Sequence, residues 1–486
     1  MIDVAFYKLN QPAYPCAPFS PGTVYPELSA MPYPVETGKE NPTYGAVRAL
    51  FLQLGYDADH AGSPEWNPLK GLVKPGERVM LKPNLVYHQH PCGEHAVLSM
   101  ITHASLIRPV VDYILLATSG DVQLTIGDAP VQGGDFEHAC KLSGIDDLVN
   151  YYRAQGVDIA CRDFRMLKTL PNKMDVLDRR VTLRGHDSFY RVDLKEKSEL
   201  CDVMDKRDRF EITDYGYGAV KKHHTQSRNE YFIPREVLEA DLFVNLPKMK
   251  THRKAGLTCA MKNLVGINGD KTSLAHHIRG TKDTGGDEFS KNSLKAKAKV
   301  RFWTFLKTNR PGIKVASAIK WFFQKFVWGG QTMKEHSMSH NPGTFSEGSW
   351  HGNDTIWRCV KDLNKIIFYA DKRGNMQDTM QRRYLFIADG ILAGEGEGPM
   401  EQSEKPFGLV LAGENPVYGD YAAARLMCYN YLHIPCIRQG FCNRWWPLVS
   451  KDPGEVQVCG NCTMEAARSY FVPCYGWQDK LTPYER

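Results

Sequence analysis

Several features that would place this 486-residue chain in a familiar class are missing from its sequence. It has no run approaching the ~18–20 apolar residues of a membrane-spanning helix, so no such helix is expected. The first residues lack a charged start followed by an apolar stretch, so we expect no secretory signal and a cytoplasmic protein. The chain also lacks the spacing of a P-loop and of a dinucleotide-binding fingerprint, so no nucleotide is predicted.

Regular cysteine spacing is also missing, although the chain has 13 cysteines. In a reducing compartment most of these should be buried thiols. Cys459 and Cys462 form a CxxC pair, which is half of a metal site or a redox pair, or else two separate thiols. Two segments contain donors that suit a metal ion: 88–103 has four imidazoles and a thiol, and 276–288 has imidazoles and carboxylates. A divalent metal is therefore one hypothesis for the cofactor, which is otherwise unknown.

Acidic residues are absent from one long segment. Residues 291–334 contain eleven Lys and Arg but no Asp or Glu, whereas the net charge of the whole chain is only +6. Within this basic insert, one helical stripe is formed by Val315, Ile319, Phe322 and Phe326. An apolar aromatic face flanked by lysines suits an anionic membrane or a lipid-phosphate substrate, and a lid or partner-docking helix is the alternative. Nucleic acid is not favoured, because no known binding module accompanies the patch.

What is present is an ordinary globular composition, 42% hydrophobic and 24% charged. Short β-rich runs alternate with helical periodicity, with strands expected at 78–81, 122–126, 157–160, 241–246, 384–389 and 408–412. Helices are expected at 44–56, 105–118, 135–155, 356–369 and 418–429. This alternation predicts an α/β fold with a mainly parallel, doubly wound-like sheet. Residues 162–232 are expected to form an antiparallel excursion.

Five regions follow from this pattern. They are an N-terminal arm and helix (1–75), a first α/β part (76–290), the basic aromatic insert (291–345), a second α/β part (346–430) and a Cys-rich extension (431–486).

Ligands in an open parallel sheet bind outside the carboxyl ends of the strands. Polar residues follow four of the predicted strands: Lys82 and Asn84, Asp128, Lys248 and Lys250, and Asp389. Gly394, Gly396 and Gly398 then form a predicted loop whose backbone N–H groups are open to an anion. Lysines, amides and glycines at one sheet edge predict a site for an anionic group.

The segment 245–271 is especially rich in such residues. Its candidate ligand-binding side chains are Asn245, Lys248, Lys250, Lys262 and Asn263. A helix over 255–265 would point its N-terminal amides at the same anion. Candidate proton-transfer groups are His252 and His277, because imidazole titrates near neutral pH. Asp128 and Asp389 would orient these groups or bind a divalent ion.

Several of these motifs resemble a known family. Val244–His252 followed by Met261–Gly266 is similar to the core signature of the domain-of-unknown-function 362 family (DUF362). The segments Lys82-Pro83-Asn84, Gly127–Pro130 and Gly394–Pro399 are similar as well, in order from about residue 78 to 430. The resemblance implies no general reaction. Some relatives carry ferredoxin-type modules, but this chain has no CxxCxxC run, so an iron–sulfur cluster is not expected. The insert resembles that of a longer subgroup, which implies surface-polysaccharide metabolism.

These observations predict an enzyme of unassigned reaction, acting on an anionic substrate in a strand-end crevice. The substrate would bear phosphate or carboxylate and be a small molecule or a lipid-linked one. A metal or iron–sulfur redox protein is one alternative, and a non-catalytic membrane-associated accessory protein is another. The expected location is cytoplasmic, with attachment to the inner membrane face through residues 291–334 as an extension of the hypothesis.

Overall fold

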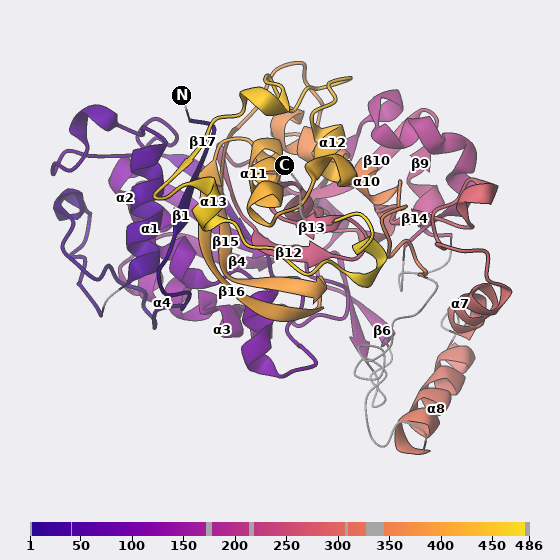
Figure 1. The fold of residues 1–486 in the computed structure, drawn as a ribbon. Helices are drawn as coiled ribbons and strands as arrows, with labels where there is room; N and C mark the ends of the chain where they lie inside the picture. Colours follow the sequence, from indigo (N-terminus) through magenta and orange to yellow (C-terminus); the bar gives the residue numbers. More distant parts are fainter. Residues whose placement is uncertain are drawn as a thin grey trace.

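The computed structural model describes residues 2–39, 41–171, 177–212, 218–306, 310–326 and 345–481. The C-terminal part of the basic insert, residues 327–344, lies outside the described residues. Figure 1 shows the chain arranged around one large sheet, with the helix pair of the insert at the periphery.

Within the described residues this sheet has ten strands, ordered β17-β1-β16-β15-β11-β2-β3-β4, with β12 pairing to β15 and β13 to β12. In chain order they are β1 (Val4–Lys8), β2 (Glu77–Pro83), β3 (Val122–Asp128), β4 (Ile159–Asp163), β11 (Leu242–Leu246), β12 (Lys248–His252), β13 (Gly256–Thr258), β15 (Arg383–Glu397), β16 (Glu401–Gly413) and β17 (Val458–Gly460). The run from β15 to β4 is parallel. Both α/β parts therefore contribute strands to one sheet, and β1 and β17 extend its far edge.

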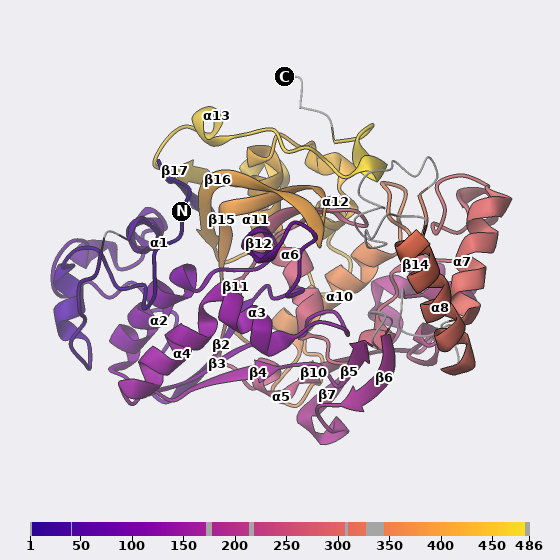
Figure 2. The ribbon, with the colours of Figure 1, turned by 90° about the horizontal axis from the view of Figure 1, so that it is seen from below.

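Helices cover both faces of the sheet (Figures 1 and 2). One hydrophobic cluster joins strand residues to α1 (Pro42–Gln53), α2 (Ala104–Thr118), α3 (Phe136–Ser143) and α4 (Ile145–Ala154). The other joins the opposite strand face to α6 (Ala260–Asn263), α10 (Ile356–Tyr369), α11 (Pro416–Leu426) and α12 (Pro435–Gly440). In β2, Val79 and Leu81 face the first cluster and Met80 faces the second, as strand alternation requires. The predicted α/β fold with a mainly parallel sheet is confirmed.

The segment after β4 forms the antiparallel excursion expected from its polar, irregular sequence. Its pairs are β7 with β10, β9 with β10, β5 with β6, and β8 with β14. Their bounds are β5 (Leu167–Pro171), β6 (Leu177–Thr182), β7 (Phe189–Asp193), β8 (Phe210–Glu211), β9 (His224–Thr225), β10 (Arg228–Pro234) and β14 (His277–Ile278). Two further short helices of the described structure are α5 (Arg235–Leu238) and α13 (Met464–Ala467).

Three sequence predictions were wrong at the level of single elements. The helix expected over 135–155 is divided into α3 and α4 at Gly144, whose φ is +78°. A Cβ there would lie 2.6 Å from Cζ of Phe19, so both the positive φ and the lack of space require glycine at this position. Residues 255–265 form β13 and the four-residue α6 instead of one helix. The expected glycine-rich loop at 394–398 is mostly the end of β15.

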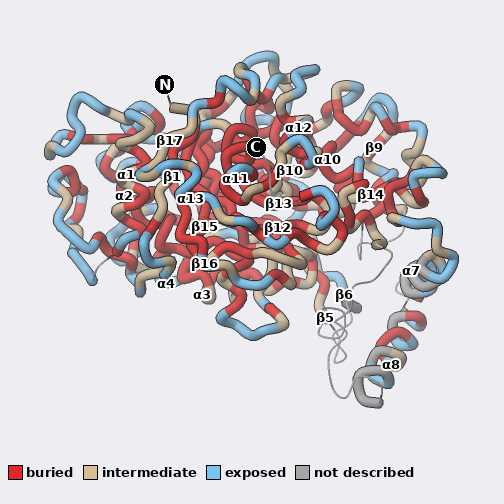
Figure 3. Tube along the Cα trace, viewed as in Figure 1, coloured by how far each residue is buried: buried red, intermediate tan, exposed pale blue. Residues whose placement is uncertain are grey.

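The basic insert begins with two helices, α7 (Leu294–Leu306) and α8 (Arg310–Phe326), and α8 confirms the helix predicted from the stripe that begins at Val315. Large apolar residues of this pair are exposed: Leu294 82%, Phe302 49%, Phe305 69%, Val315 49%, Trp321 43% and Phe322 52%. Figure 3 colours stretches of the pair as exposed. These side chains of the insert are therefore less buried than those of the core. In the part of the chain that the structure describes, no helix is long and apolar enough to span a membrane.

Candidate functional site

The predicted polar residues meet at the carboxyl ends of β2, β3 and β11, next to Asp389 in the middle of the longer strand β15, because these neighbouring strands are parallel. β12 begins at that edge and runs beside β15, with Lys248 opposite Asp389 and Lys250 opposite Gly394. Alternation along the strand directs Lys248, Lys250 and His252 away from Met249, which is in the core. The strand-end cluster, as we call it, therefore comes from five strands and from the segment 260–277.

Lys82 and Asp128 form the first of two buried ion pairs in this cluster. Lys82 Nζ lies 2.7 Å from Asp128 Oδ1 and also donates to the carbonyl of Pro83 and to Asn263 Oδ1. Asp128 accepts from the backbone N–H groups of Leu85 and Ala129 as well. Burial lowers the pKa of Lys82, and the Asp128 carboxylate opposes that shift.

Gly266 is required by this ion pair. A Cβ at Gly266 would lie 1.9 Å from Asp128 Oδ1 and 2.6 Å from Lys82 Nζ. The carbonyl of Gly266 accepts a hydrogen bond from the N–H of Ala129, so its backbone passes directly over the pair. Glycine in the signature Met261–Gly266 thus permits close packing of the 260–266 segment on β3.

Lys248 and Asp389 form the second buried pair, with Nζ 3.0 Å from Oδ2. Tyr14 completes it: its hydroxyl accepts from Lys248 Nζ at 2.6 Å and lies 2.7 Å from Asp389 Oδ1. The same carboxylate accepts from the N–H groups of His103 and Ile391. Asp389 is therefore fully engaged and holds Lys248 in place, as Asp128 holds Lys82. The sequence assigned the two aspartates to orienting His252 and His277, whereas in the described structure their partners are lysines, Tyr14 and backbone N–H groups.

The three predicted asparagines frame the lysines. Asn263 Nδ2 donates to Asn245 Oδ1 at 2.7 Å and to the carbonyl of Lys82 at 3.2 Å. Asn245 donates to the carbonyl of Ala260 and to the hydroxyl of Tyr384. Asn84 Oδ1 accepts from Lys250 Nζ at 3.3 Å. These amides tie β2, β11 and α6 together and fix the positions of the ammonium groups.

Three further lysines have no carboxylate within ion-pair distance among the residues that the structure describes: Lys250, Lys262 and Lys271. Lys250 is 1% exposed and donates to the carbonyl of Met100 at 2.5 Å. Burial, reinforced by the charges of Lys248 and Lys262, holds its pKa well below the ordinary value. Burial also lowers the pKa of Lys262 to about 8 and that of Lys271 to about 7. Lys262 is the partly exposed member of the three.

His252 lies on the same face as Lys250. Its Nδ1 accepts the backbone N–H groups of Lys254 and Ala255, at 3.0 and 3.2 Å. Burial and the charges of Lys262 and Lys250 hold the pKa of His252 well below its usual value, so the ring is neutral near pH 7. A neutral ring with Nδ1 occupied carries its proton on Nε2. His252 is therefore set to donate a hydrogen bond.

His276 and His277 lie beside this cluster. Burial lowers both pKa values far below the usual range, with the charge of Lys254 contributing to each. His276 Nε2 and His277 Nδ1 are buried and make no hydrogen bond among the described residues. Each ring thus has a nitrogen available to a ligand or a proton. The segment that follows the basic insert closes over them, since Asn353 donates to the carbonyl of His276 at 2.9 Å.

Gly394, Gly396 and Gly398 do not form an open anion-binding loop. The N–H of Gly396 donates to the carbonyl of Val472, and that of Gly398 donates to Gly396. A Cβ at Gly394 would lie 2.4 Å from Gln402 Cγ, and one at Gly398 would lie 2.0 Å from the carbonyl oxygen of Thr251. These glycines permit the close approach of β15, β16 and β12, which explains their presence without a ligand.

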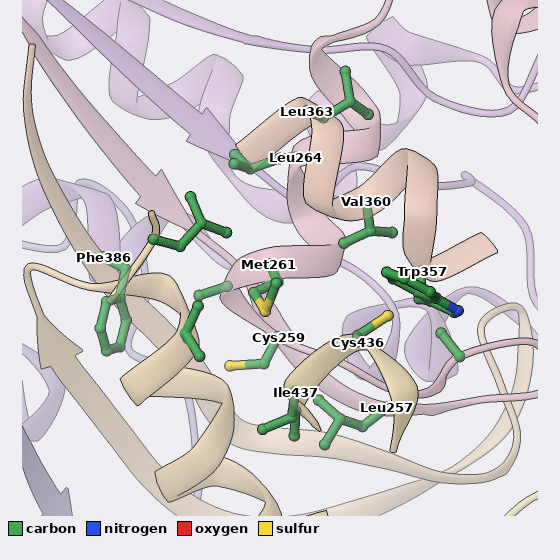
Figure 4. Close-up of a cluster of buried hydrophobic side chains, with 14 of the residues drawn as sticks. Leu257, Cys259, Met261, Leu264, Trp357, Val360, Leu363, Phe386, Cys436 and Ile437 are labelled. Carbon is green, nitrogen blue, oxygen red and sulfur yellow. The ribbon is translucent and has the colours of Figure 1, made fainter. Parts of the chain in front are cut away.

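The amino end of α6 is also unavailable to an anion, because the buried Asp420 accepts the N–H of Met261. Burial raises the pKa of Asp420 to about 7. Around α6 the structure is a dense apolar cluster, in which Cys259, Met261 and Cys436 pack with Trp357 of α10 (Figure 4). The helix end therefore belongs to the core.

The cysteine pair near the C-terminus divides between the two faces of the sheet. Cys459 packs against the cluster of α1–α4, and Cys462 against the other cluster. In the described ranges, no group of three or more His, Cys, Asp or Glu residues is arranged to hold a metal ion. The histidines of the 88–103 segment have other contacts there: His90 Nε2 lies 2.8 Å from the carbonyl oxygen of Gln402, and His103 Nδ1 accepts from the N–H of Ser105.

Tyr14 is the residue of this cluster that the sequence did not indicate. It comes from the Pro-, Gly- and Tyr-rich arm near the N-terminus and stacks on His103 with ring centroids 4.0 Å apart. Its contact with Asp389 spans 375 residues of chain. Several tyrosines share that arm, and no local pattern distinguishes the one that reaches the site.

Comparison with known proteins adds a family and two distant likenesses. The model of the family described as "Domain of unknown function (DUF362)" matches residues 79–183 and 202–425. The thylakoid-associated protein sll1697 of Synechocystis sp. is 24% identical over 220 residues, covering 44% of this chain and 48% of that protein. The chain thus spans about half the length of this curated relative. A crystal structure of a Thermotoga maritima protein aligns at 10% identity with a TM-score of 0.28, covering 74% of this chain and 54% of that one. The family match includes most of the chain and every lysine of the strand-end cluster. The chain therefore belongs to the DUF362 family.

Proposed function

We propose that this protein is an enzyme that binds an anionic, phosphate- or carboxylate-bearing substrate at the strand-end cluster. The observation that carries the proposal is the set of three lysines, Lys250, Lys262 and Lys271, that lack a carboxylate partner in the described structure. A buried ammonium group without a counter-ion costs several kcal/mol, so a fold keeps it only with a compensating role. An anionic ligand supplies the missing charge.

The remaining groups suit a reaction at that ligand. Lys82 and Lys248 keep their charge because Asp128 and Asp389 pair with them, and they add a fixed positive field. The Nε2–H of His252 would donate to a ligand oxygen. His277 Nδ1, which is buried without a partner among the described residues, would accept a proton.

Anion binding is the direct test. We expect Lys250→Met to weaken the affinity for inorganic phosphate by about 10- to 100-fold, because a hydrogen bond to a charged group contributes about 1.5–3 kcal/mol. Isothermal titration calorimetry on the full chain measures this, with thermal unfolding as a check on folding. Lys405→Met is the matched control, since Lys405 is paired with Glu395 outside the cluster. Equal affinity in the parent and in Lys250→Met, or no binding of phosphate at millimolar concentration, would contradict the proposal.

We further propose that the helix pair α7–α8 attaches the protein to an anionic membrane surface. Among its described side chains, the pair exposes six large apolar ones. The surrounding segment, residues 291–334, has eleven basic residues and no acidic one. Each Lys or Arg near an anionic bilayer contributes about 1 kcal/mol to binding, and aromatic side chains insert at its interface. The name of the relative includes a thylakoid association, which fits binding to a membrane surface. The resemblance of the insert to that of the longer subgroup fits surface-polysaccharide metabolism.

The ends of the insert connect this surface to the site. Ser290 donates its N–H to the carbonyl of Phe345, so the chain enters and leaves the insert at one place. Lys254 Nζ donates to the carbonyl of Glu347, two residues further on. A membrane-bound α7–α8 would therefore hold the strand-end cluster near the headgroups, where a lipid-linked substrate is found.

Vesicle flotation tests the attachment. We expect the parent to float with vesicles of 30% phosphatidylglycerol and 70% phosphatidylcholine, and Trp321→Glu with Phe322→Glu to bind more than about 100-fold more weakly. The reason is that burying each aromatic side chain contributes about 1.5–3 kcal/mol. Val24→Glu, which changes a 79% exposed side chain elsewhere, is the matched control and should float like the parent. Unchanged flotation of the double variant would dismiss the helix pair as the attachment.

A further inference from the structure

We propose that the ligand of the strand-end cluster carries a diphosphate group and that it takes up protons with it as it binds. This inference rests on the proposed function and names the substrate class of the same site. It comes from the balance of charges inside the cluster and from the separation of the lysines over three segments.

The charge balance sets the size of the anion. The cluster contains five lysines, Lys82, Lys248, Lys250, Lys262 and Lys271, and two carboxylates that are each paired with a lysine. Three lysines remain without a carboxylate among the described residues, so the cluster has up to three uncompensated ammonium charges when all three are protonated. In a poorly hydrated site each uncompensated charge is costly, so the ligand that fits best brings close to three negative charges. A carboxylate brings one and a phosphate monoester at most two, whereas a diphosphate brings two to three.

The three lysines approach the ligand from different segments. Lys250 lies on β12 beside Asn84 of the β2 end, and Lys262 lies on α6. Lys271 begins a short 3-10 helix, Lys271–Ser273, and its Nζ donates to the carbonyl of Val265 at 3.2 Å. Lys262 is a neighbouring charge of both Lys250 and Lys271. A ligand with two linked phosphoryl groups can engage both outer lysines and share Lys262 between them.

The surroundings of these lysines lower the fraction of them that is protonated before a ligand binds. Lys262 is faced by Lys254, Lys82, Cys436 and Cys359, and burial lowers its pKa to about 8. The groups that face Lys271 are Asp128, Lys82, Lys262 and Arg165, and its pKa is about 7. Those that face Lys250 are Lys248, Lys262, Asp128 and Lys82. None of these three sets supplies an unpaired carboxylate, so an arriving anion raises all three pKa values and draws protons from solution.

Only one lysine of the three is partly exposed, and this orients the ligand. Lys250 and Lys271 are 1% and 8% exposed, whereas Lys262 has intermediate exposure. The group esterified to the diphosphate would therefore leave the site on the side of Lys262 and His276, toward the base of the insert. A lipid-linked diphosphate and a soluble nucleoside diphosphate share this chemistry.

Calorimetry on the full chain tests the inference with acetate, inorganic phosphate and pyrophosphate at pH 8, in two buffers of different ionisation enthalpy. We expect pyrophosphate to bind about tenfold or more tightly than phosphate. We also expect uptake of about one proton or more per pyrophosphate, and a fall in affinity of about tenfold or more from pH 7 to pH 9. The charge of the probe itself grows over that range and acts in the opposite direction, so a fall belongs to the protein.

Lys262→Met should remove most of the preference for pyrophosphate over phosphate, while Lys405→Met should keep it. Equal affinity for the two anions, or binding without proton uptake, overturns the diphosphate inference and leaves the anion site standing. Failure of all three probes to bind overturns the proposed function as well. Farnesyl diphosphate and uridine diphosphate then distinguish the sources: tighter binding of the first indicates a lipid-linked substrate, and tighter binding of the second indicates a soluble nucleotide.

Discussion

Replacing Asp389 by alanine is expected to lower the free energy of unfolding by about 3–5 kcal/mol, because it leaves the buried Lys248 ammonium without its counter-ion. The same change removes the acceptor of the N–H groups of His103 and Ile391. Chemical denaturation at pH 7 measures the loss. The carboxylate accepts from β12, from β15, from the N-cap residue of α2 and from the N-terminal arm.

Two further variants separate the charge from the hydrogen bonds. Tyr14→Phe removes a hydroxyl but leaves the ion pair intact, so it should cost only about 1 kcal/mol. Combining Asp389→Ala with Lys248→Met removes both charges and should recover a large share of the lost stability. A cost for Asp389→Ala no larger than that of Tyr14→Phe would show that the pair is not the unit that holds Lys248.

Lys262→Met is expected to act in opposite directions on stability and on binding. The Lys262 side chain makes no hydrogen bond or ion pair among the described residues, so replacing it by methionine leaves no acceptor without its donor. Removing a charge whose pKa is held at about 8 should stabilise the ligand-free protein at pH 7 by about 1–3 kcal/mol. The same change should weaken pyrophosphate binding by about tenfold or more.

The pH dependence of this gain has a definite sign. The pKa of Lys262 is lower in the folded chain than in the unfolded one, so the unfolded state binds more protons between about pH 8 and the ordinary lysine value of 10.5. The parent therefore gains stability as the pH rises through this window. The difference between parent and variant should be fully present below about pH 8 and should vanish near pH 10.5. A variant that is less stable than the parent at pH 7 would indicate that Lys262 has a structural role.

Much of the sheet could be predicted from the sequence, because its strands are short, apolar and bounded by polar or turn residues. Lys82, Asp128, Lys248 and Asp389 were placed at one edge by a simple argument: parallel neighbours end on the same side. The pairing of these four was not predictable, since the sequence does not say which lysine meets which carboxylate. That pairing decides which lysines are left for a ligand, so the chemistry of the site depends on tertiary contacts.

Long-range packing explains the errors in single elements. A helix over 135–155 is consistent with its periodicity, but Phe19 from the N-terminal arm packs where a side chain at position 144 would lie. The glycines at 394–398 have the composition of a loop, and only the approach of Thr251 and Gln402 shows that they serve a tightly packed sheet. For α8 the local pattern was sufficient, because an exposed amphipathic helix depends little on distant contacts.

The position of β1 in the sheet determines when the fold can be completed during synthesis. This strand pairs with β16 and β17, so residues 4–8 have no sheet partner until residues 401–413 have left the ribosome. Such distant pairing is slow to form and leaves strand edges exposed meanwhile. The β2–β4 region can assemble early from local segments, whereas the edge that includes β1 must wait for nearly the whole chain. Chaperone demand should accordingly fall on the first strand, far in sequence from the residues that complete it.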